Sequence, residues 1–299
     1  MFIIGMFITG FTTSEMRGLK ASERLDLWSW LSTVWGKTFA RVLQEKNSMR
    51  LTGNTILITG GTSGIGRALA EVFHERGNQV IIAGRRQGLL NEITAAHPGM
   101  HGMQLDVEDP RAVEAFAARV REQFPKLNVL INNAGISKRE DLTADTIDLS
   151  GARSIIHTNI VGVLHLTATL LPSLKQQPNS TIITTTSGLA FVPFAPFPTY
   201  CATKAFLHSW MQSLRFQLRE TSVEVLELIP PYVQTELSGP HQATDPHAMP
   251  LADYIGEVMQ VLDDPNRSGD EILVERVKTL RWAGKNEDYE RIFIAHNNR

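Results

Sequence analysis

Tyr200 and Lys204 are the residues in this chain whose types and spacing could support acid–base chemistry. They lie four positions apart in the segment Tyr-Cys-Ala-Thr-Lys, and on a helix this spacing places both side chains on one face. A free tyrosine titrates near about 10, but a neighbouring cation favours the phenolate. We therefore expect the lysine to lower the pKa of the tyrosine, which would make the phenol a general acid or base. The alternative is a tyrosine packed in a core helix with a solvated lysine one turn later.

A glycine-rich segment upstream of this pair predicts a nucleotide site. Residues 59–66 read Thr-Gly-Gly-Thr-Ser-Gly-Ile-Gly and join a short apolar strand, 55–59, to a helix that begins at Ile65. Glycines at such a junction let the backbone turn tightly and approach a pyrophosphate, whose charge faces the free amides of the helix N-terminus. No Gly-Lys-Ser/Thr follows, which excludes the phosphate loop of nucleotide hydrolases. A glycine-rich turn without a ligand is the alternative.

The elements that would position these residues alternate along the chain from Thr55. The predicted strands are 55–59, 79–83, 102–105, 127–132, 181–185, 223–229 and 271–274. The predicted helices are 65–76, 87–96, 110–124, 149–175 with an interruption near Asn159, a helix that carries Tyr200 and ends near residue 220, and 252–262. Apolar strands joined by helices indicate an α/β fold, a doubly wound parallel sheet of about seven strands with helices on both faces.

The composition excludes several classes of protein. The 299 residues are 42% hydrophobic and 20% charged, with a net charge of -2, which is typical of a globular protein. No basic excess indicates binding to nucleic acid. Cys201 is the single cysteine, so the chain has no disulfide framework. We expect a cytoplasmic protein in which Cys201 is a packing residue.

Residues 1–48 are predicted to be an N-terminal extension, and residues 49–299 a single domain. The apolar stretch 1–11 is too short to span a bilayer, and no basic residues precede it as a signal peptide requires. Residues 22–44 have the spacing of one amphipathic helix, which could lie on a membrane or pack on the domain. The segment that starts at Met49 resembles a natural protein start, so we expect no firm membrane association and an extension that the fold does not need.

Five motifs in order resemble the short-chain dehydrogenase/reductase family. They are residues 59–66, Asn-Asn-Ala-Gly at 132–135, Asn159, Ser187 and Tyr200 with Lys204. Ser187 precedes Tyr200 by thirteen residues, the usual separation in that family, and the resemblance covers residues 51 to about 275. Within the family, the region from Met49 is similar to bacterial oxidoreductases related to an enzyme encoded with D-alanine-transfer genes. The resemblance implies a Rossmann-like, NAD(P)-binding oxidoreductase domain.

The resemblance also implies a role for each motif residue. The catalytic set would be Asn159, Ser187, Tyr200 and Lys204. Tyr200 would give its proton to a carbonyl oxygen, and Ser187 would donate a hydrogen bond to the same oxygen. Lys204 would hold the nicotinamide ribose, and Asn159 would hold a water that links Lys204 to solvent. The predicted cofactor-binding residues are Gly60, Thr62, Ser63, Gly64, Ile65, Gly66, Arg85, Arg86, Asp106, Val107, Asn133, Ala134, Gly135, Tyr200, Lys204, Val233 and Thr235.

The end of the second strand favours NADP over NAD. Residues 83–86 read Ala-Gly-Arg-Arg, without the carboxylate that would bind the ribose 2′-hydroxyl of NAD. Gly84 leaves room for a 2′-phosphate, and the guanidinium of Arg85 suits one. The alternative is that Arg85 and Arg86 are the solvated start of a helix.

Two features near the predicted substrate pocket are harder to interpret. Pro230 is followed by Pro231 where the family usually has Pro-Gly, so we expect a changed pocket wall next to the contacts of Val233 and Thr235. The rings between Ser187 and Tyr200 could wall an apolar substrate pocket or pack beneath the loop; they are Phe191, Phe194 and Phe197. His241 and His247 have no partner at metal-ligand spacing, so no metal site is predicted.

The leading hypothesis is an NADP(H)-dependent oxidoreductase that interconverts a carbonyl and a primary or secondary alcohol of a small, apolar molecule. The resemblance implies a homodimer or homotetramer, joined through the helices that carry Asn159 and Tyr200. The alternative is a non-catalytic NAD(P)-binding sensor, against which the intact catalytic set argues. Epimerisation of a sugar nucleotide would need a larger C-terminal domain than the roughly 60 residues after the sixth strand.

Overall fold

The computed structural model describes residues 49–267, 269–285 and 288–298. The expectations for residues 1–48 lie outside the described residues. Near the start of the described chain, Met49 and Leu51 are buried in the hydrophobic core.

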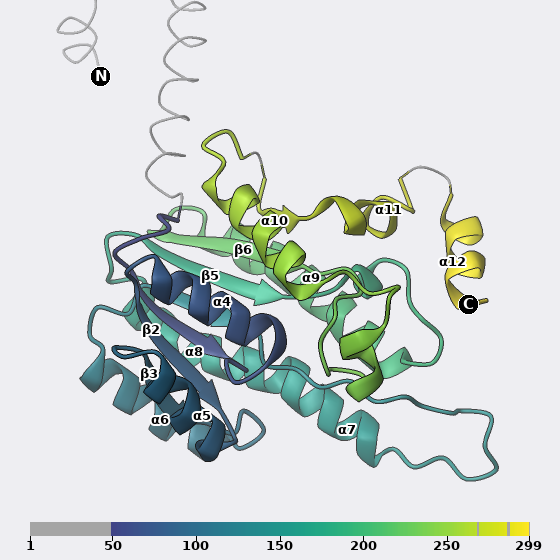
Figure 1. Cartoon of the computed structure of the whole chain (residues 1–299), viewed down its shortest axis with the longest axis horizontal. Helices are drawn as coiled ribbons and strands as arrows, with labels where there is room; N and C mark the ends of the chain where they lie inside the picture. Colours follow the sequence, from purple (N-terminus) through teal and green to yellow (C-terminus); the bar gives the residue numbers. More distant parts are fainter. Residues whose placement is uncertain (1–48, 268, 286–287, 299) are drawn as a thin grey trace, which may run out of the picture. The chain divides into compact units, whose positions relative to one another are not determined.

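A parallel sheet of seven strands forms the centre of the domain (Figure 1). The strands are β1 (Thr55–Thr59), β2 (Gln79–Gly84), β3 (His101–Gln104), β4 (Val129–Asn132), β5 (Ser180–Thr185), β6 (Val223–Ile229) and β7 (Glu271–Leu273). Their order across the sheet is β3-β2-β1-β4-β5-β6-β7. The order reverses between β1 and β4, and in doubly wound sheets the ligand site lies at the carboxyl ends of the strands beside such a point.

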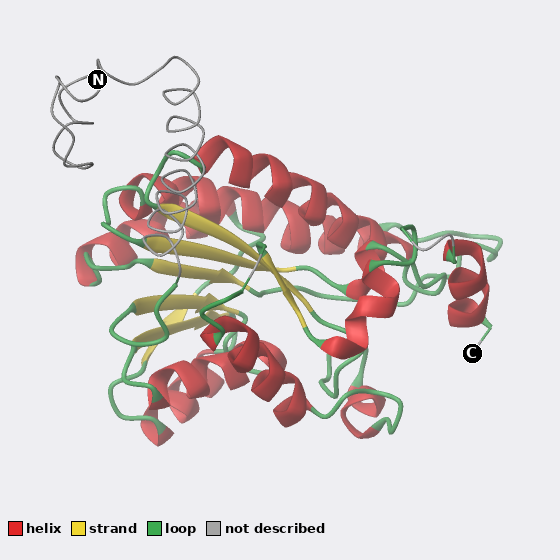
Figure 2. Cartoon of the chain, turned by 90° about the horizontal axis from the view of Figure 1, so that it is seen from above, coloured by secondary structure: helices red, strands yellow, loops and turns green. Residues whose placement is uncertain are grey.

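Helices cover both faces of this sheet (Figure 2). The helices are α4 (Gly64–Glu75), α5 (Gln87–Ala96), α6 (Pro110–Gln123), α7 (Ser150–Ile156), α8 (Gly162–Leu174), α9 (Pro198–Leu218), α10 (Leu251–Asp263), α11 (Lys278–Arg281) and α12 (Tyr289–Asn297). Apolar side chains of α4, α5 and α10 pack with Ile56 and Ile58 on one face. Those of α6, α8 and α9 pack with Leu57 on the other. Side chains alternate along a strand, so β1 contributes to both cores.

The long helix predicted at 149–175 is continuous but contains one irregular turn. Between α7 and α8, residues His157–Val161 form a π-helical turn, η1. The turn contains Asn159, which is fully buried. In the part of the chain that the structure describes, the 25 residues Ser150–Leu174 are the one helix long and apolar enough to cross a membrane. Their side chains Ile155, Leu166 and Leu170 are buried within the domain, as in the core helix of a globular fold.

The predicted fold class is confirmed, with every predicted strand and helix within a few residues of its expected position. The short turns η2 (Gly188–Ala190), η3 (Pro240–Thr244) and η4 (Glu275–Val277) and the helices α11 and α12 were not predicted. Of these, α11 has only four residues, too few for a hydrophobic period to show in the sequence.

Candidate active site

A cavity of about 630 Å³ opens at the carboxyl ends of the strands. It is lined by the glycine-rich turn after β1, the end of β2, the segment after β4, and residues from β5, α9 and the segment after β6. Every predicted site residue lines this cavity except Gly66 and Asn159. The sheet therefore brings together side chains that are more than a hundred positions apart in the sequence.

The glycine-rich turn packs closely on the end of β4. Gly60 has φ of 66°, and a Cβ placed on it would lie 2.9 Å from Cα of Ala134. A Cβ on Gly66 would collide with the side-chain amide of Asn133 and with the carbonyl oxygen of Gly60. Glycine at these two positions allows the close approach, and the residues at the N-terminus of α4, Ser63, Gly64 and Ile65, line the cavity.

Thr59 fixes the position of this turn, a role that the sequence did not single out. Its Oγ1 accepts hydrogen bonds from the backbone amides of Asn133, at 3.0 Å, and Ala134, at 3.1 Å. The Asn133 side chain donates back to the carbonyl oxygen of Thr59 at 3.3 Å. These bonds tie the ends of β1 and β4 together on either side of the point where the strand order reverses.

At the end of β2, two arginines border the cavity beside the glycine-rich turn. Nη2 of Arg86 donates to Oγ1 of Thr62 and to Oγ of Ser63, both at 3.1 Å. A Cβ on Gly84 would lie 3.2 Å from Cγ2 of Thr62. The lack of a side chain at Gly84 therefore lets the end of β2 pack closely on the turn. Arg85 lines this part of the cavity. The sequence pattern favours Arg85 as the phosphate ligand, whereas in the structure Arg86 is the arginine hydrogen-bonded to the turn.

Tyr200 and Lys204 project from the first turns of α9 into the cavity, as their spacing predicted. Both are nearly closed to solvent, with exposed fractions of 7% and 4%. Nζ of Lys204 donates to the carbonyl oxygen of Thr185 at 2.8 Å and lies 5.6 Å from the centroid of the Tyr200 ring. Ser187 follows β5 and lines the cavity beside them, and its Oγ accepts a hydrogen bond from the amide of Leu189 at 3.1 Å.

The electrostatics of the Tyr200–Lys204 pair differ from the expectation. Burial raises the pKa of the Tyr200 phenol well above its usual range, and a hydrogen bond with Ser187 offsets part of that rise. Burial lowers the pKa of Lys204 to about 8, while the charge of Glu227 opposes that change. Burial of the phenol outweighs any effect of the nearby ammonium, which donates to the Thr185 carbonyl. The phenol is therefore protonated at neutral pH.

Asn159 lies behind the cavity wall. Its Oδ1 accepts from the backbone amide of Ile136 at 2.9 Å, and its Nδ2 donates to the carbonyl oxygen of Ile136 at 3.0 Å and to Oγ1 of Thr203 at 3.2 Å. A Cβ on Gly135 would lie 3.3 Å from Oδ1 of Asn159 and 3.7 Å from Nζ of Lys204. The π-helical turn thus links the segment after β4 to α9 next to Lys204.

The segment after β6 is held together by hydrogen bonds of a buried glutamine. Gln242 is buried, and its Nε2 donates to the carbonyl oxygen of Val233 at 2.8 Å and to Oγ1 of Thr235 at 3.1 Å. Met249 and Tyr232 are joined by a backbone hydrogen bond, which folds the segment back on itself. Gln242 therefore positions the two residues expected to contact a nicotinamide, and no motif identified it in the sequence.

The phenylalanines between Ser187 and Tyr200 pack against other side chains and do not wall the substrate cavity. Phe194 and Phe197 pack with Tyr200, Cys201 and Ile155 in a small apolar cluster. None of the three rings lines the main cavity. His241 and His247 are exposed, in agreement with their interpretation as solvated residues.

The chain resembles known proteins over this same region. The profile of the short chain dehydrogenase family matches residues 54–246. The uncharacterized oxidoreductase DltE of Bacillus subtilis is 43% identical over 251 residues, which cover 83% of this chain and 98% of that protein. Dehydrogenase/reductase SDR family member 7B of Mus musculus is 32% identical over 66% of this chain and 64% of its own length.

Solved structures agree with the fold. A short chain dehydrogenase from Burkholderia cenocepacia in complex with NADP superposes with a TM-score of 0.71 at 23% identity, covering 83% of this chain and 99% of that chain. The closed form of serine dehydrogenase complexed with NADP+ gives a TM-score of 0.66 at 27% identity, covering 72% and 92% of the two chains. The sequence match and the arrangement of the cavity lead to one conclusion: this chain belongs to the short chain dehydrogenase family.

Proposed function

We propose that the protein is an NADP(H)-dependent oxidoreductase that interconverts a carbonyl and a primary or secondary alcohol. One observation carries the proposal. Ser187, Tyr200 and Lys204 open into the same cavity as the glycine-rich turn and the two arginines after β2. An acid and a nucleotide cradle that share one cavity are what a transfer between a cofactor and a carbonyl requires.

The fit of a dinucleotide rests on the shape and charge of this cavity. The glycine-rich turn would hold the pyrophosphate at the N-terminus of α4. A Cβ on Gly60 or Gly66 would clash with neighbouring atoms of this turn. Asp106 and Val107 border the region proposed for the adenine, and Asn133, Ala134 and Gly135 border the path towards the nicotinamide. Val233 and Thr235, held by Gln242, would contact the nicotinamide amide.

The preference for NADP rests on the corner after β2. Arg85 and Arg86 bring two cations beside Gly84, and the residues at this strand end include no carboxylate to repel a 2′-phosphate. The serine dehydrogenase and the Burkholderia protein named above were solved with NADP+ and NADP. Another related fold, a 3-ketoacyl-(acyl-carrier-protein) reductase from Brucella melitensis, was solved with NADH, so the fold alone does not decide the cofactor.

The proposed chemistry assigns one task to each residue. A bound nicotinamide would supply or accept the hydride. Tyr200, protonated at neutral pH, would donate its proton to the carbonyl oxygen during reduction. Ser187, whose Oγ accepts from the amide of Leu189 and which hydrogen-bonds Tyr200, would turn its hydroxyl proton to the same carbonyl oxygen when a substrate is bound. Lys204 would hold the ribose hydroxyls, and Asn159 would keep the cavity wall in register with α9.

We further propose a small-molecule substrate and an assembly of two or four identical chains. The sensor alternative is not favoured, because the acid and its supporting residues are all in place at the cavity. Several relatives are named as dehydrogenases or reductases, among them serine 3-dehydrogenase of Agrobacterium fabrum, 36% identical over 62% of this chain.

A turnover screen tests the proposed function. Purified full-length protein is mixed with NADPH and a panel of aldehydes, ketones and keto-acyl compounds, and consumption of NADPH is followed by absorbance. We expect steady turnover with at least one carbonyl class and faster turnover with NADPH than with NADH. If the protein binds NADPH but turns over none of the panel in either direction, the sensor becomes the better account.

A further inference from the structure

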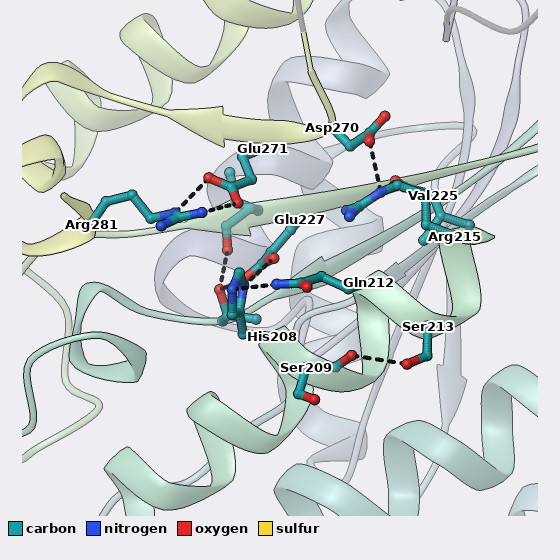
Figure 3. Close-up of polar contacts among 12 residues, drawn as sticks. His208, Ser209, Gln212, Ser213, Arg215, Val225, Glu227, Asp270, Glu271 and Arg281 are labelled. Atoms are coloured by element: carbon teal, nitrogen blue, oxygen red, sulfur yellow. Dashed lines mark hydrogen bonds and ion pairs between the residues drawn. The ribbon is translucent and has the colours of Figure 1, made fainter. Parts of the chain in front are cut away.

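Glu227 is a fully buried carboxylate beside the catalytic residues, and the proposed reaction does not use it (Figure 3). It lies on β6, in register with Thr184 of β5. Oε1 of Glu227 accepts a hydrogen bond from the Thr186 hydroxyl at 2.7 Å. Burying a carboxylate away from water costs free energy unless charges or hydrogen bonds compensate it. The groups around Glu227 must therefore supply this compensation.

His208 is the second partner of this carboxylate. Its Nδ1 lies 2.8 and 3.0 Å from the two carboxylate oxygens of Glu227. Nε2 of His208 lies 2.7 Å from Nε2 of Gln212, which donates to it. Nε2 therefore accepts, and the ring proton is on Nδ1 and donates to Glu227. His208 thus holds the carboxylate in place through a hydrogen bond from Nδ1.

Two other charged residues near Glu227, Glu271 and Arg281, neutralise each other. From β7, Glu271 approaches the same pocket, and Arg281 of α11 donates to both of its oxygens at 2.7 Å (Figure 3). Ligand atoms of His208, Glu227 and Glu271 lie within 4.8 Å of one another, which is close enough to hold a metal ion. Each group already has a hydrogen-bond partner, and Arg281 already supplies a cation, so we do not assign a metal site here. The charge that remains is that of Glu227.

Lys204 is a cation whose hydrogen-bond acceptor adjoins a partner of this carboxylate in the chain. Thr186, which donates to Glu227, directly follows Thr185, whose carbonyl oxygen accepts from Nζ of Lys204 at 2.8 Å. On α9, His208 lies one turn after Lys204, so the same helix face meets the carboxylate. The other titratable group that faces Lys204 is Tyr200, which is protonated at neutral pH. Burial favours neutral Lys204 and the charge of Glu227 opposes it.

We infer that Glu227 is a positioning residue that keeps Lys204 protonated near neutral pH, with Thr186 and His208 holding its carboxylate in place. This inference rests on the proposed role of Lys204 in the active site. It predicts that the protonation of Lys204 depends on a residue that touches neither substrate nor cofactor.

Carbon-13 NMR of lysine side chains tests the inference without any need for turnover. The Cε signal of Lys204, identified by its loss in Lys204→Met, is titrated with pH in the full-length protein. In Glu227→Gln we expect the pKa of Lys204 to fall by about one unit or more, because the amide keeps the shape but not the charge. Glu227→Asp, which keeps the charge, should restore most of the original value.

Glu224→Gln is the matched control. Glu224 is a half-buried carboxylate of β6 that pairs with Arg267 at 2.7 Å, and its removal should leave the titration of Lys204 unchanged. A Lys204 pKa that is the same in Glu227→Gln and in the wild type overturns the inference. If Glu227→Gln does not fold, the wild-type side-chain carboxyl carbon of Glu227 should still report the Lys204 titration, and its failure to do so overturns the inference equally. Absence of turnover on every carbonyl would overturn the proposed function alone.

Discussion

Lys204 is a cation held in a nearly closed environment, where its hydrogen-bond acceptor is a neutral carbonyl. Burial lowers its pKa in the folded state to about 8, below the ordinary lysine value of 10.5. Between these two pH values the unfolded chain binds more protons than the folded chain, so the free energy of unfolding rises with pH across this window. Below the window, the folded state carries the cost of a buried charge.

Replacing Lys204 with Met should remove this pH dependence. Between about pH 7 and pH 10, we expect the stability of the wild type to rise relative to that of Lys204→Met by roughly 2 kcal/mol. Denaturant unfolding of both proteins at the two pH values measures the difference. Lys175→Met, which removes an exposed lysine, corrects for the loss of a surface charge. A constant difference between wild type and Lys204→Met would mean that Lys204 titrates alike in the folded and unfolded chains.

The two arginines after β2 should affect the cofactors differently. Arg85→Ala should weaken NADPH about tenfold or more and leave NADH nearly unchanged, because only the 2′-phosphate gains from the guanidinium. Arg86→Ala also removes the hydrogen bonds to Thr62 and Ser63, so it should weaken both cofactors and NADPH more strongly. Titration of each variant with both cofactors decides this. A parallel loss in Arg85→Ala would assign Arg85 to the fold or to the pyrophosphate.

Motif residues could be located from the sequence, whereas their supporting residues could not. Tyr200, Lys204 and Ser187 carry a recognisable spacing, and the cavity brings them together. Gln242 and Glu227 have no such signal. Gln242 acts through a segment that folds back onto Val233, and Glu227 through a pocket closed by β5, α9 and α11. Such contacts depend on the tertiary arrangement, which local periodicity does not contain. The expected lowering of the Tyr200 pKa failed for the same reason, because burial outweighs the nearby lysine.

At the scale of elements, α9 begins without a cap of its own. Phe197 precedes the helix and offers no side-chain hydrogen bond. Glu140, from the segment after β4, supplies the acceptors: Oε1 accepts from the Thr199 amide at 3.1 Å and Oε2 from the Thr199 hydroxyl at 2.7 Å. A carboxylate also complements the positive end of the helix dipole. Tyr200, the proposed acid, is the next residue, so we expect this cap to help position the phenol.

Glu140→Ala should therefore lower the free energy of unfolding by about 1 kcal/mol. It should also lower kcat more than it weakens cofactor binding, since the glycine-rich turn is formed by other elements. Denaturant unfolding and steady-state kinetics check the two effects. Glu122→Ala, at an exposed site on α6, is the control. Equal stability of Glu140→Ala and wild type would show that the first turn of α9 is held by its packing alone.

The regular helices and strands could be predicted from the sequence because each has a strong hydrophobic period. The apolar runs of β1, β4 and β6 and the amphipathic α4 and α10 gave boundaries close to those observed. The helices α11 and α12 did not, because neither contains a fully buried side chain to create a period. What fixes α12 is tertiary: Asn297 accepts from the amide of Ala195 at 2.6 Å and donates to the carbonyl oxygen of Pro193 at 3.1 Å.

At the scale of the whole molecule, the helices that carry Asn159 and Tyr200 present apolar side chains to the outside. Ile156 of α7, Val161 of η1 and Phe206 of α9 are each 41% exposed. Other apolar side chains of these helices, among them Ile155 and Leu207, are buried in the domain. A second copy of the chain related by a two-fold axis would cover the exposed side chains and stiffen the catalytic helix.

Light scattering at micromolar concentration should find a homodimer or homotetramer. Phe206→Glu should shift the population to smaller species, because a charge would be buried in the interface. Leu142→Glu, at an exposed leucine of the segment after β4, should leave the assembly unchanged. A monodisperse, active wild-type monomer would contradict the proposed assembly.

The central claim is that Tyr200 supplies the proton in a carbonyl–alcohol interconversion, and Tyr200→Phe tests it most directly. The variant keeps the ring and removes the phenol hydroxyl, and with it the transferable proton. With the best carbonyl substrate from the screen, we predict that turnover falls by on the order of a hundredfold or more while NADPH affinity stays nearly unchanged. Tyr289→Phe, at an exposed tyrosine of α12, should keep full activity. Turnover of Tyr200→Phe equal to that of the wild type would contradict the assignment of Tyr200 as the acid.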